Sequence, residues 1–212
     1  MIVDPDEEAR AILERADVDD AEPPNALRLA LAVTGGRVLL VAPTEVWGLG
    51  EVAMDDDGEL EILVSTGQND LERAWTLAHE VAHVHLRRGG WTGGYRESED
   101  AADAIAAALL MPRRAFSRAT RQHGRRAFVG LASAFHVTET AAALRVGEVE
   151  RVPVAVIAPT HLRVRGPEEW AWGTEGELRA LARGGRPGLH RARLTDDARR
   201  VVLVADELEV VG

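Results

Sequence analysis

Hydrophobic positions recur at helical spacing in seven stretches of this chain. These stretches cover about residues 6–16, 25–33, 69–88, 97–111, 115–123, 126–134 and 138–147. The clearest stretch begins at Asn69, whose side chain can cap the first turn while Glu72 reaches back to complete a capping box. Gly89 and Gly90 follow its last turn, where glycine commonly ends a helix. We therefore expect one long helix near the middle of the chain.

Between the second and third helical stretches the hydrophobic period falls to two. Asp57 and Gly58 form a hairpin signal between residues 51–54 and residues 59–64, which alternate in polarity. A continuous apolar run from Val38 to Val41 predicts a further strand over residues 37–42, just before them. We expect these strands to form a small, half-buried antiparallel sheet ahead of the long helix.

Beyond Arg151 the helical spacing gives way to short apolar stretches. Those at about residues 154–157, 161–165, 190–194 and 201–204 predict strands, with a loop at residues 184–188 among them. Helices and strands in this order predict an α+β fold. We expect two parts, a domain over residues 1–151 and a small strand-rich extension over residues 152–212, whose role the sequence does not indicate.

The composition narrows the kinds of site that the chain can build. It contains no cysteine, which excludes disulfides and thiolate ligands, so any metal ion must be held by histidine and carboxylate. The formal net charge of -10 disfavours binding to nucleic acid phosphates. The acidic N-terminus is unlike a signal peptide, and no apolar stretch is long enough to span a bilayer. We expect a cytoplasmic protein without a membrane partner.

A metal-ligand motif lies inside the long predicted helix. Residues 79–83 read His-Glu-x-x-His, and histidines four positions apart share one helix face, about 6 Å apart along the axis. Both imidazoles can therefore reach one ion. Glu80 is rotated by about 100° from His79, so it is free to contact water at the open position of the ion and to act as general base.

A third ligand is expected from the next helix, because a catalytic zinc site has three protein ligands and an open position. Glu99 lies near the start of that helix, after a loop long enough to fold it back antiparallel. Asp103, four positions later on the same face, can accept the second ring N–H of a ligand histidine. His79 is the favoured partner over His83. Glu97 is a competing third ligand.

Two blocks of this sequence resemble the ImmA/IrrE metallopeptidases. Residues 75–83, Trp-Thr-Leu-Ala-His-Glu-Val-Ala-His, are similar to the family's "fTLAHElgH" block, and residues 99–112 are similar to its "ExEANxFAAxLLMP" block. The resemblance covers about residues 37–147. Ala101, Asp103 and Ile105 depart from the family's usual glutamate, asparagine and phenylalanine, but none of these changes removes a proposed ligand.

The resemblance implies a zincin-like metallopeptidase core followed by a helical segment. Carried over by position, it makes His79, His83 and Glu99 the ligands of one zinc ion, and Glu80 the base. The same ligands would also accept manganese, iron or cobalt. The family includes proteases that cleave a repressor of the helix-turn-helix type and so switch on phage, mobile-element or DNA-damage genes. The implied partner is therefore a protein substrate, plausibly a transcriptional repressor.

Other histidines and aromatic residues carry weaker signals. His85 points off the metal face, and we expect it to be structural or at the surface. Trp75 and Leu71, at helical spacing, are predicted to be core residues and not part of a substrate pocket. No spacing marks the group that would stabilise the oxyanion. Its candidates are Tyr95, Arg96, His123, His136 and His161.

Residues 131–141 have the cadence of a helix-turn-helix. A DNA-reading helix uses basic and amide side chains, yet Arg145 is the only basic residue between Glu139 and Glu148. We expect this segment to pack within the fold. The leading hypothesis is therefore a zinc peptidase. The alternatives are a non-catalytic module that binds a ligand or partner through the same fold and, less favoured, a DNA-binding regulator.

Overall fold

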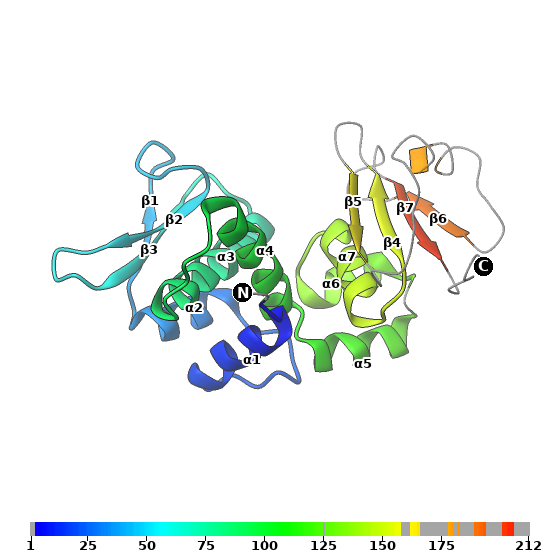
Figure 1. The fold of residues 1–212 in the computed structure, drawn as a ribbon, viewed down its shortest axis with the longest axis horizontal. Coiled ribbons are helices and arrows are strands. Elements are labelled where there is room, and N and C mark those ends of the chain that lie inside the picture. The colour runs from blue at the N-terminus through cyan, green and yellow to red at the C-terminus, as the bar shows by residue number, and fades with distance from the viewer. Residues whose placement is uncertain are drawn as a thin grey trace. The chain divides into compact units, whose positions relative to one another are not determined.

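The protein has a mixed α+β fold, as predicted (Figure 1). The computed structural model describes residues 3–124, 126–157, 162–165, 178–179, 182, 189–193 and 201–205. The helices are α1 (Pro5–Arg15), α2 (Ala26–Thr34), α3 (Asp70–Arg88), α4 (Tyr95–Leu110), α5 (Arg113–His123), α6 (Phe128–Phe135) and α7 (Glu139–Val149). The strands are β1 (Val38–Val41), β2 (Gly50–Met54), β3 (Leu60–Ser65), β4 (Val154–Ile157), β5 (Leu162–Arg165), β6 (Leu189–Arg193) and β7 (Val201–Ala205).

The chain divides into two compact units, Met1–Ala115 and Phe116–Gly212, with the division inside α5. The first unit contains both sequence blocks that resemble the metallopeptidases. The predicted extension over residues 152–212 begins inside the second unit and stays a prediction. Among the described helices, none combines the length and the apolar character that crossing a bilayer requires.

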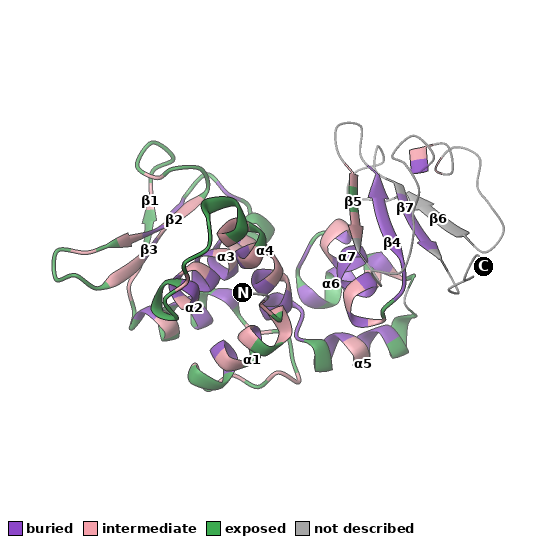
Figure 2. Ribbon diagram, in the orientation of Figure 1, coloured by how far each residue is buried: buried purple, intermediate pink, exposed green. Residues whose placement is uncertain are grey.

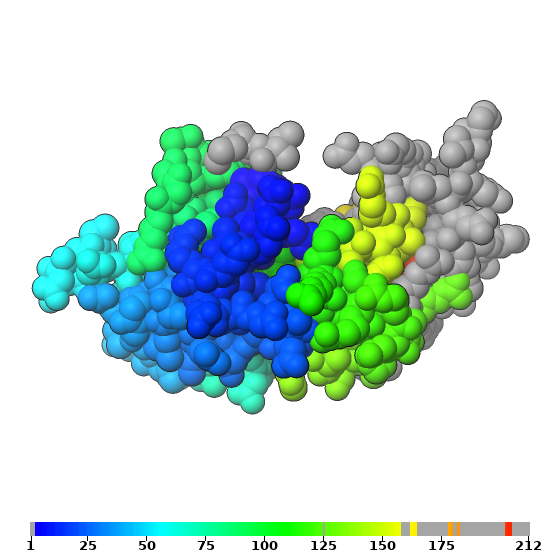
Figure 3. All heavy atoms as spheres, turned by 90° about the horizontal axis from the view of Figure 1, so that it is seen from below, coloured from blue at the N-terminus to red at the C-terminus, as the bar shows by residue number. Residues whose placement is uncertain are grey.

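The sheet of the first unit is mixed, whereas the sequence predicted an antiparallel one. Its strand order is β1-β3-β2, with β2 antiparallel to β3 and β1 parallel to β3. After β1 the chain crosses to the opposite edge of the sheet and forms β2. The hairpin turn at Asp55–Gly58 then reverses the chain, so β3 lies between β1 and β2 and runs in the same direction as β1. An apolar run alone gives no strand direction, which is why the prediction was wrong here. The tip of the hairpin projects from the unit (Figures 1 and 3).

Local signals in the sequence set the ends of α3. The Asn69 side chain accepts from the Glu72 backbone N–H, and the Glu72 carboxylate accepts from the Asn69 N–H, so the predicted capping box is complete. Gly89 is the C-cap. α4 begins at Tyr95, two residues before the predicted start, and packs against α3. Buried apolar side chains from both helices, including those of Val81 and Ile105, form part of the core (Figure 2).

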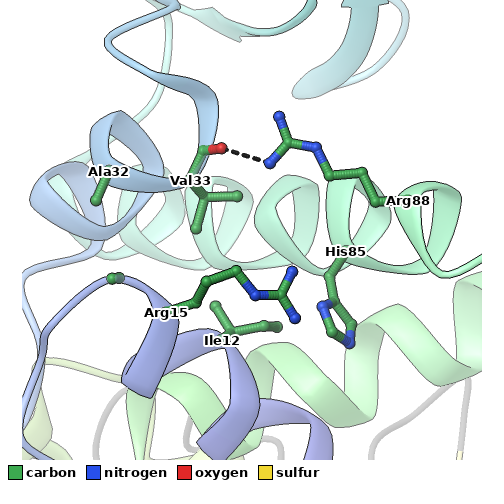
Figure 4. A pocket seen from close by; sticks show the side chains of 7 residues that line it. Ile12, Arg15, Ala32, Val33, His85 and Arg88 are labelled. Carbon is green, nitrogen blue, oxygen red and sulfur yellow. Dashed lines mark hydrogen bonds between the residues drawn. The ribbon is translucent and has the colours of Figure 1, made fainter.

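The two N-terminal helices are joined to α3 by polar contacts at its C-terminal end. His85 Nε2 lies 2.6 Å from Glu8 Oε2 of α1, which confirms the structural role expected for this histidine. The Arg88 guanidinium donates to the Val33 carbonyl at the end of α2, over 2.7 Å (Figure 4). The positive charge of Arg88 also interacts favourably with the negative, C-terminal ends of the α2 and α3 helix dipoles. These contacts fix the helix that carries the metal-ligand motif.

The second unit contains α6, α7 and an antiparallel sheet of order β5-β4-β7-β6. The strands predicted after Arg151 are present, although residues 184–188, His161 and Leu194 lie outside the described residues. α6 and α7 pack against each other as expected. Arg145 on α7 is only 2% exposed and lies 3.2 Å from Glu148 Oε2, so this arginine is not at the surface to meet DNA.

Candidate metal centre

Two consecutive helices bring together three side chains that could hold a metal ion. His79 and His83 lie one turn apart on α3, and their Nε2 atoms are 3.0 Å from each other. Glu99 comes from the second turn of α4. One of its carboxylate oxygens lies 3.4 Å from His79 Nε2 and the other lies 3.2 Å from His83 Nε2. One ligand atom from each residue can be chosen so that all three lie within 4.8 Å of one another.

These separations fit a small divalent cation. Zinc binds histidine nitrogen and carboxylate oxygen at about 2.0–2.2 Å, so ligand atoms around a tetrahedral ion lie roughly 3.3 Å apart. The distance between the two ring nitrogens, 3.0 Å, and the distances from each of them to its nearer Glu99 oxygen, 3.2 and 3.4 Å to different oxygens, lie within a few tenths of an ångström of that value. Two ring nitrogens and a carboxylate therefore face one point, where a single cation could bind to all three.

Both histidines are also held through their second ring nitrogen. His79 Nδ1 lies 3.0 Å from Asp103 Oδ1, the partner that the sequence favoured. With a carboxylate accepting from Nδ1–H, Nε2 presents its lone pair towards Glu99 and His83. Ser98 Oγ lies 3.5 Å from His83 Nδ1, a long contact that the sequence did not indicate. The second sequence block begins at Glu99, so no motif in the sequence indicated a role for Ser98.

The competing ligand Glu97 has another role in the structure. Its carboxylate accepts from the Gly94 backbone N–H over 3.1 Å, which caps the first turn of α4. Glu97 is therefore directed to the start of the helix, and its neighbour Glu99 faces the two histidines.

Glu80 is buried beside the histidines, with 6% of its surface exposed. Burial, with repulsion from the nearby carboxylates of Glu99 and Glu51, raises the pKa of Glu80 to about 7 against the opposing charges of His79 and Arg87. Burial lowers the pKa of His83, and the charge of His79 adds to that effect. Burial also acts to lower the pKa of His79, but the hydrogen bond to Asp103 and three carboxylates outweigh it and raise that pKa.

The raised pKa of Glu80 predicts a cost to folding in the metal-free protein. Its folded pKa exceeds the unfolded value of 4.5, so folding is penalised progressively as pH rises from about 4.5 to about 7 and fully above that range. Glu80→Gln removes the ionisation. We expect the variant to be more stable than wild type by about 3 kcal/mol at pH 8 and almost equally stable at pH 4.5.

Denaturant unfolding in the presence of a chelator, at both pH values, measures this difference. Glu59→Gln, at an exposed position of the hairpin, is the control and should change stability little at either pH. Equal stability of the Glu80→Gln variant and wild type at pH 8 would contradict the expected penalty.

The candidate ligands lie in a cleft of about 720 Å³. One wall is formed by residues 47–52, the floor by α3, and the other wall by Trp91, Gly93 and the first half of α4. Trp75 lines this cleft and Leu71 is exposed, so the prediction that both are core residues was wrong. Periodicity places a side chain on a helix face but does not say what covers that face.

Of the residues considered for stabilising an oxyanion, Tyr95 lines the cleft. Arg96, the next residue, is exposed and is absent from the lining of this described cleft. His123 and His136 belong to the second unit, and His161 lies outside the described residues. Arg87 also lines the cleft, with its guanidinium 2.9 Å from the Val52 carbonyl oxygen. The sequence did not single out this arginine.

A helix-borne His-Glu-x-x-His pair with a carboxylate from the following helix is an arrangement of the metallopeptidase type. Residues 40–146 match the family described as the IrrE N-terminal-like domain of peptidase M78, and the chain belongs to this family. The match confirms the resemblance seen in the two sequence blocks and the zincin-like α+β fold that it implies. A search of curated proteins gave no match.

Proposed function

We propose that this protein is a zinc-dependent endopeptidase that cleaves a cytoplasmic protein substrate. His79, His83 and Glu99 hold the ion, and Glu80 is the general base. The observation that carries the proposal is the convergence of the three ligand atoms beside a buried Glu80, in a chain of a metallopeptidase family. A scaffold without catalytic activity would have no use for a buried carboxylate that costs folding free energy.

The chemistry follows from the positions of the side chains. Bound zinc would polarise the scissile carbonyl and make water a stronger acid. Glu80 then accepts a proton from the attacking water and later delivers it to the leaving amine nitrogen. Asp103 keeps His79 in the tautomer that offers Nε2 as a ligand.

The edge of the sheet supports a peptide as substrate. The Leu49 carbonyl accepts from the Ser65 N–H and the Asp55 N–H donates to the Glu59 carbonyl, so the intervening even-numbered residues direct their N–H and C=O groups away from β3. Among the described strands, β2 pairs only with β3, and its Gly50–Val52 segment lines the cleft, where the Val52 carbonyl accepts from Arg87, so a peptide would have to share or replace that contact. An extended peptide can add to such an edge through main-chain hydrogen bonds.

Gly50 brings that edge close to the base. A Cβ built on Gly50 would lie 2.4 Å from Thr76 Cγ2 and 3.4 Å from Glu80 Cγ, so only glycine allows this approach of β2 to α3. A peptide paired with β2 would therefore run past Glu80 and the candidate ligands. This geometry favours cleavage within a chain over removal of a terminal residue.

The substrate proposed is a transcriptional repressor of the helix-turn-helix type, whose cleavage would derepress phage, mobile-element or stress genes. Family resemblance supports this class of substrate. The acidic balance of the chain and the burial of Arg145 fit a protein that acts on a regulator and not on DNA itself.

Hydrolysis of a regulator encoded beside this protein tests the proposal. The purified protein should cleave that regulator at one or a few sites when supplied with zinc, and cleavage should stop on chelation. Intact-mass spectrometry of the products measures both results, with an unfolded carrier protein as a second substrate. Stoichiometric metal with no hydrolysis of either protein would favour the alternative of a non-catalytic binding module.

A further inference from the structure

Aromatic side chains gather at the metal cleft. The sequence has five tryptophans and one tyrosine, and four of these six residues, Trp47, Trp75, Trp91 and Tyr95, line the cleft. The other two lie outside the described residues. Aromatic residues make up only 4% of the chain, so their concentration beside the candidate active site requires a local explanation.

The direction in which β2 runs along α3 shows which residues lie at each end of the cleft. Gly50 lies against Thr76 and Glu80, whereas the Val52 carbonyl accepts from Arg87. β2 therefore runs from the N-terminal part of α3 towards its C-terminal end. Leu49 precedes Gly50 and lies at the Trp75 end of the cleft, whereas Trp47, on the turn before it, donates its backbone N–H to the Glu51 carboxylate and lines the same wall. The Leu49 carbonyl also accepts from Gln68, which Thr76 contacts in turn.

The opposite end of the cleft is also apolar. α4 runs antiparallel to α3, because Asp103 meets His79 while Ser98 meets His83. Tyr95 therefore lies beyond His83, towards the C-terminal end of α3. Leu86 of α3 and Trp91 of the following loop line the same end. The candidate metal ligands thus lie between two apolar groups, Leu49 and Trp75 at one end and Leu86, Trp91 and Tyr95 at the other, with Trp47 on the wall before β2.

Several of these side chains are left uncovered in the folded unit. Trp47 is 88% exposed and Tyr95 is 81% exposed, and the loop before β2 is largely at the surface (Figure 2). Exposed apolar side chains grouped beside a cleft mark a surface that buries them against a ligand. Trp91 lines the same cleft, and its indole lies against Gly93, where any side chain larger than hydrogen would collide with the ring.

We propose that the cleft binds an extended segment of protein that carries a large apolar side chain on each side of the cleaved bond. One side chain packs on Trp47 and Trp75, and the other packs on Leu86 and Trp91. Trp75 and Leu86 are 11 positions apart, about 16 Å along the helix, which an extended peptide spans with about five residues. The apolar residues therefore lie within about three positions of the cleaved bond.

The position of the cleaved bond rests on the proposed function, whereas peptide binding does not. The test therefore measures both the rate of cleavage and the affinity for the peptide. Matched peptides carry phenylalanine or serine at the position facing Trp47. Wild type should prefer the phenylalanine peptide in kcat/KM, and Trp47→Ala should reduce this preference by about 10- to 100-fold. Leu40→Ala, which is 61% exposed on β1 and outside the cleft lining, is the control and should keep the wild-type preference.

Binding is measured separately with the Glu80→Gln variant, by fluorescence anisotropy of the labelled, uncleaved peptides. The phenylalanine peptide should bind more tightly, and adding Trp47→Ala should remove most of the difference. An unchanged peptide preference after Trp47→Ala, in both kcat/KM and affinity, would overturn the inference. Trp47-dependent binding without hydrolysis by wild type would support the subsite while refuting the peptidase.

Discussion

Glu80→Gln is expected to slow peptide hydrolysis by about 10²- to 10⁴-fold while leaving the bound metal in place. The substitution keeps the size of the side chain at a position with 6% exposure but removes its ability to accept a proton. Glu80 is not one of the three residues whose ligand atoms converge, so the ion should stay. Initial rates on a matched peptide, together with elemental analysis of the same sample, measure both effects.

The control for this experiment is Glu97→Gln. Glu97 lies on the adjacent helix, and its carboxylate caps the Gly94 N–H, away from the ligand set. Its rate should stay close to that of wild type. If the Glu80→Gln variant were fully active, another group would have to accept the proton and the mechanism given above would be wrong.

Alanine at either His83 or Glu99 is expected to remove the bound ion. Wild type should contain about one zinc per chain after purification with zinc, because three protein ligands converge at one point. Removing one ligand leaves two, which is too few to retain the ion through desalting. Asp103→Asn should keep the ligands but weaken metal affinity by about 10- to 100-fold, since it removes the charged partner of His79.

Elemental analysis and competition with a chromogenic chelator measure stoichiometry and affinity in the same set of variants. Glu97→Ala is the matched control, because the sequence left it as a competing ligand and the structure directs it to the helix cap. Loss of the ion from Glu97→Ala and its retention in Glu99→Ala would reverse the assignment of the third ligand.

The sequence predicted most of what depends on local chemistry. The capping box of α3, the glycine at its end and the turn of the hairpin are each encoded within a few residues, and each is present in the structure. The His79, Glu80 and His83 spacing likewise needs only helix geometry. Glu99 and Asp103 were placed with help from a second sequence block, and the structure brings both to the histidines.

What the sequence missed depends on contacts between distant segments. The parallel pairing of β1 is decided by where the loop before β2 crosses the sheet, and apolar runs do not encode that path. Trp75 has the spacing of a core residue, but only the neighbouring wall shows that its face of α3 is an open cleft. The roles of Arg87 and Gly50 depend on the packing of β2 against α3, which the sequence does not show.

The joining of α3 to α4 has a consequence for how the centre assembles. All three candidate ligands lie between positions 79 and 99, on two helices linked by a short loop. Bringing such nearby segments together costs little loop-closure entropy, and contacts of low sequence separation form early in folding. The centre is therefore a property of one helical hairpin. A bound ion would act as a cross-link within that hairpin and stabilise it while the sheet and the N-terminal helices are still packing.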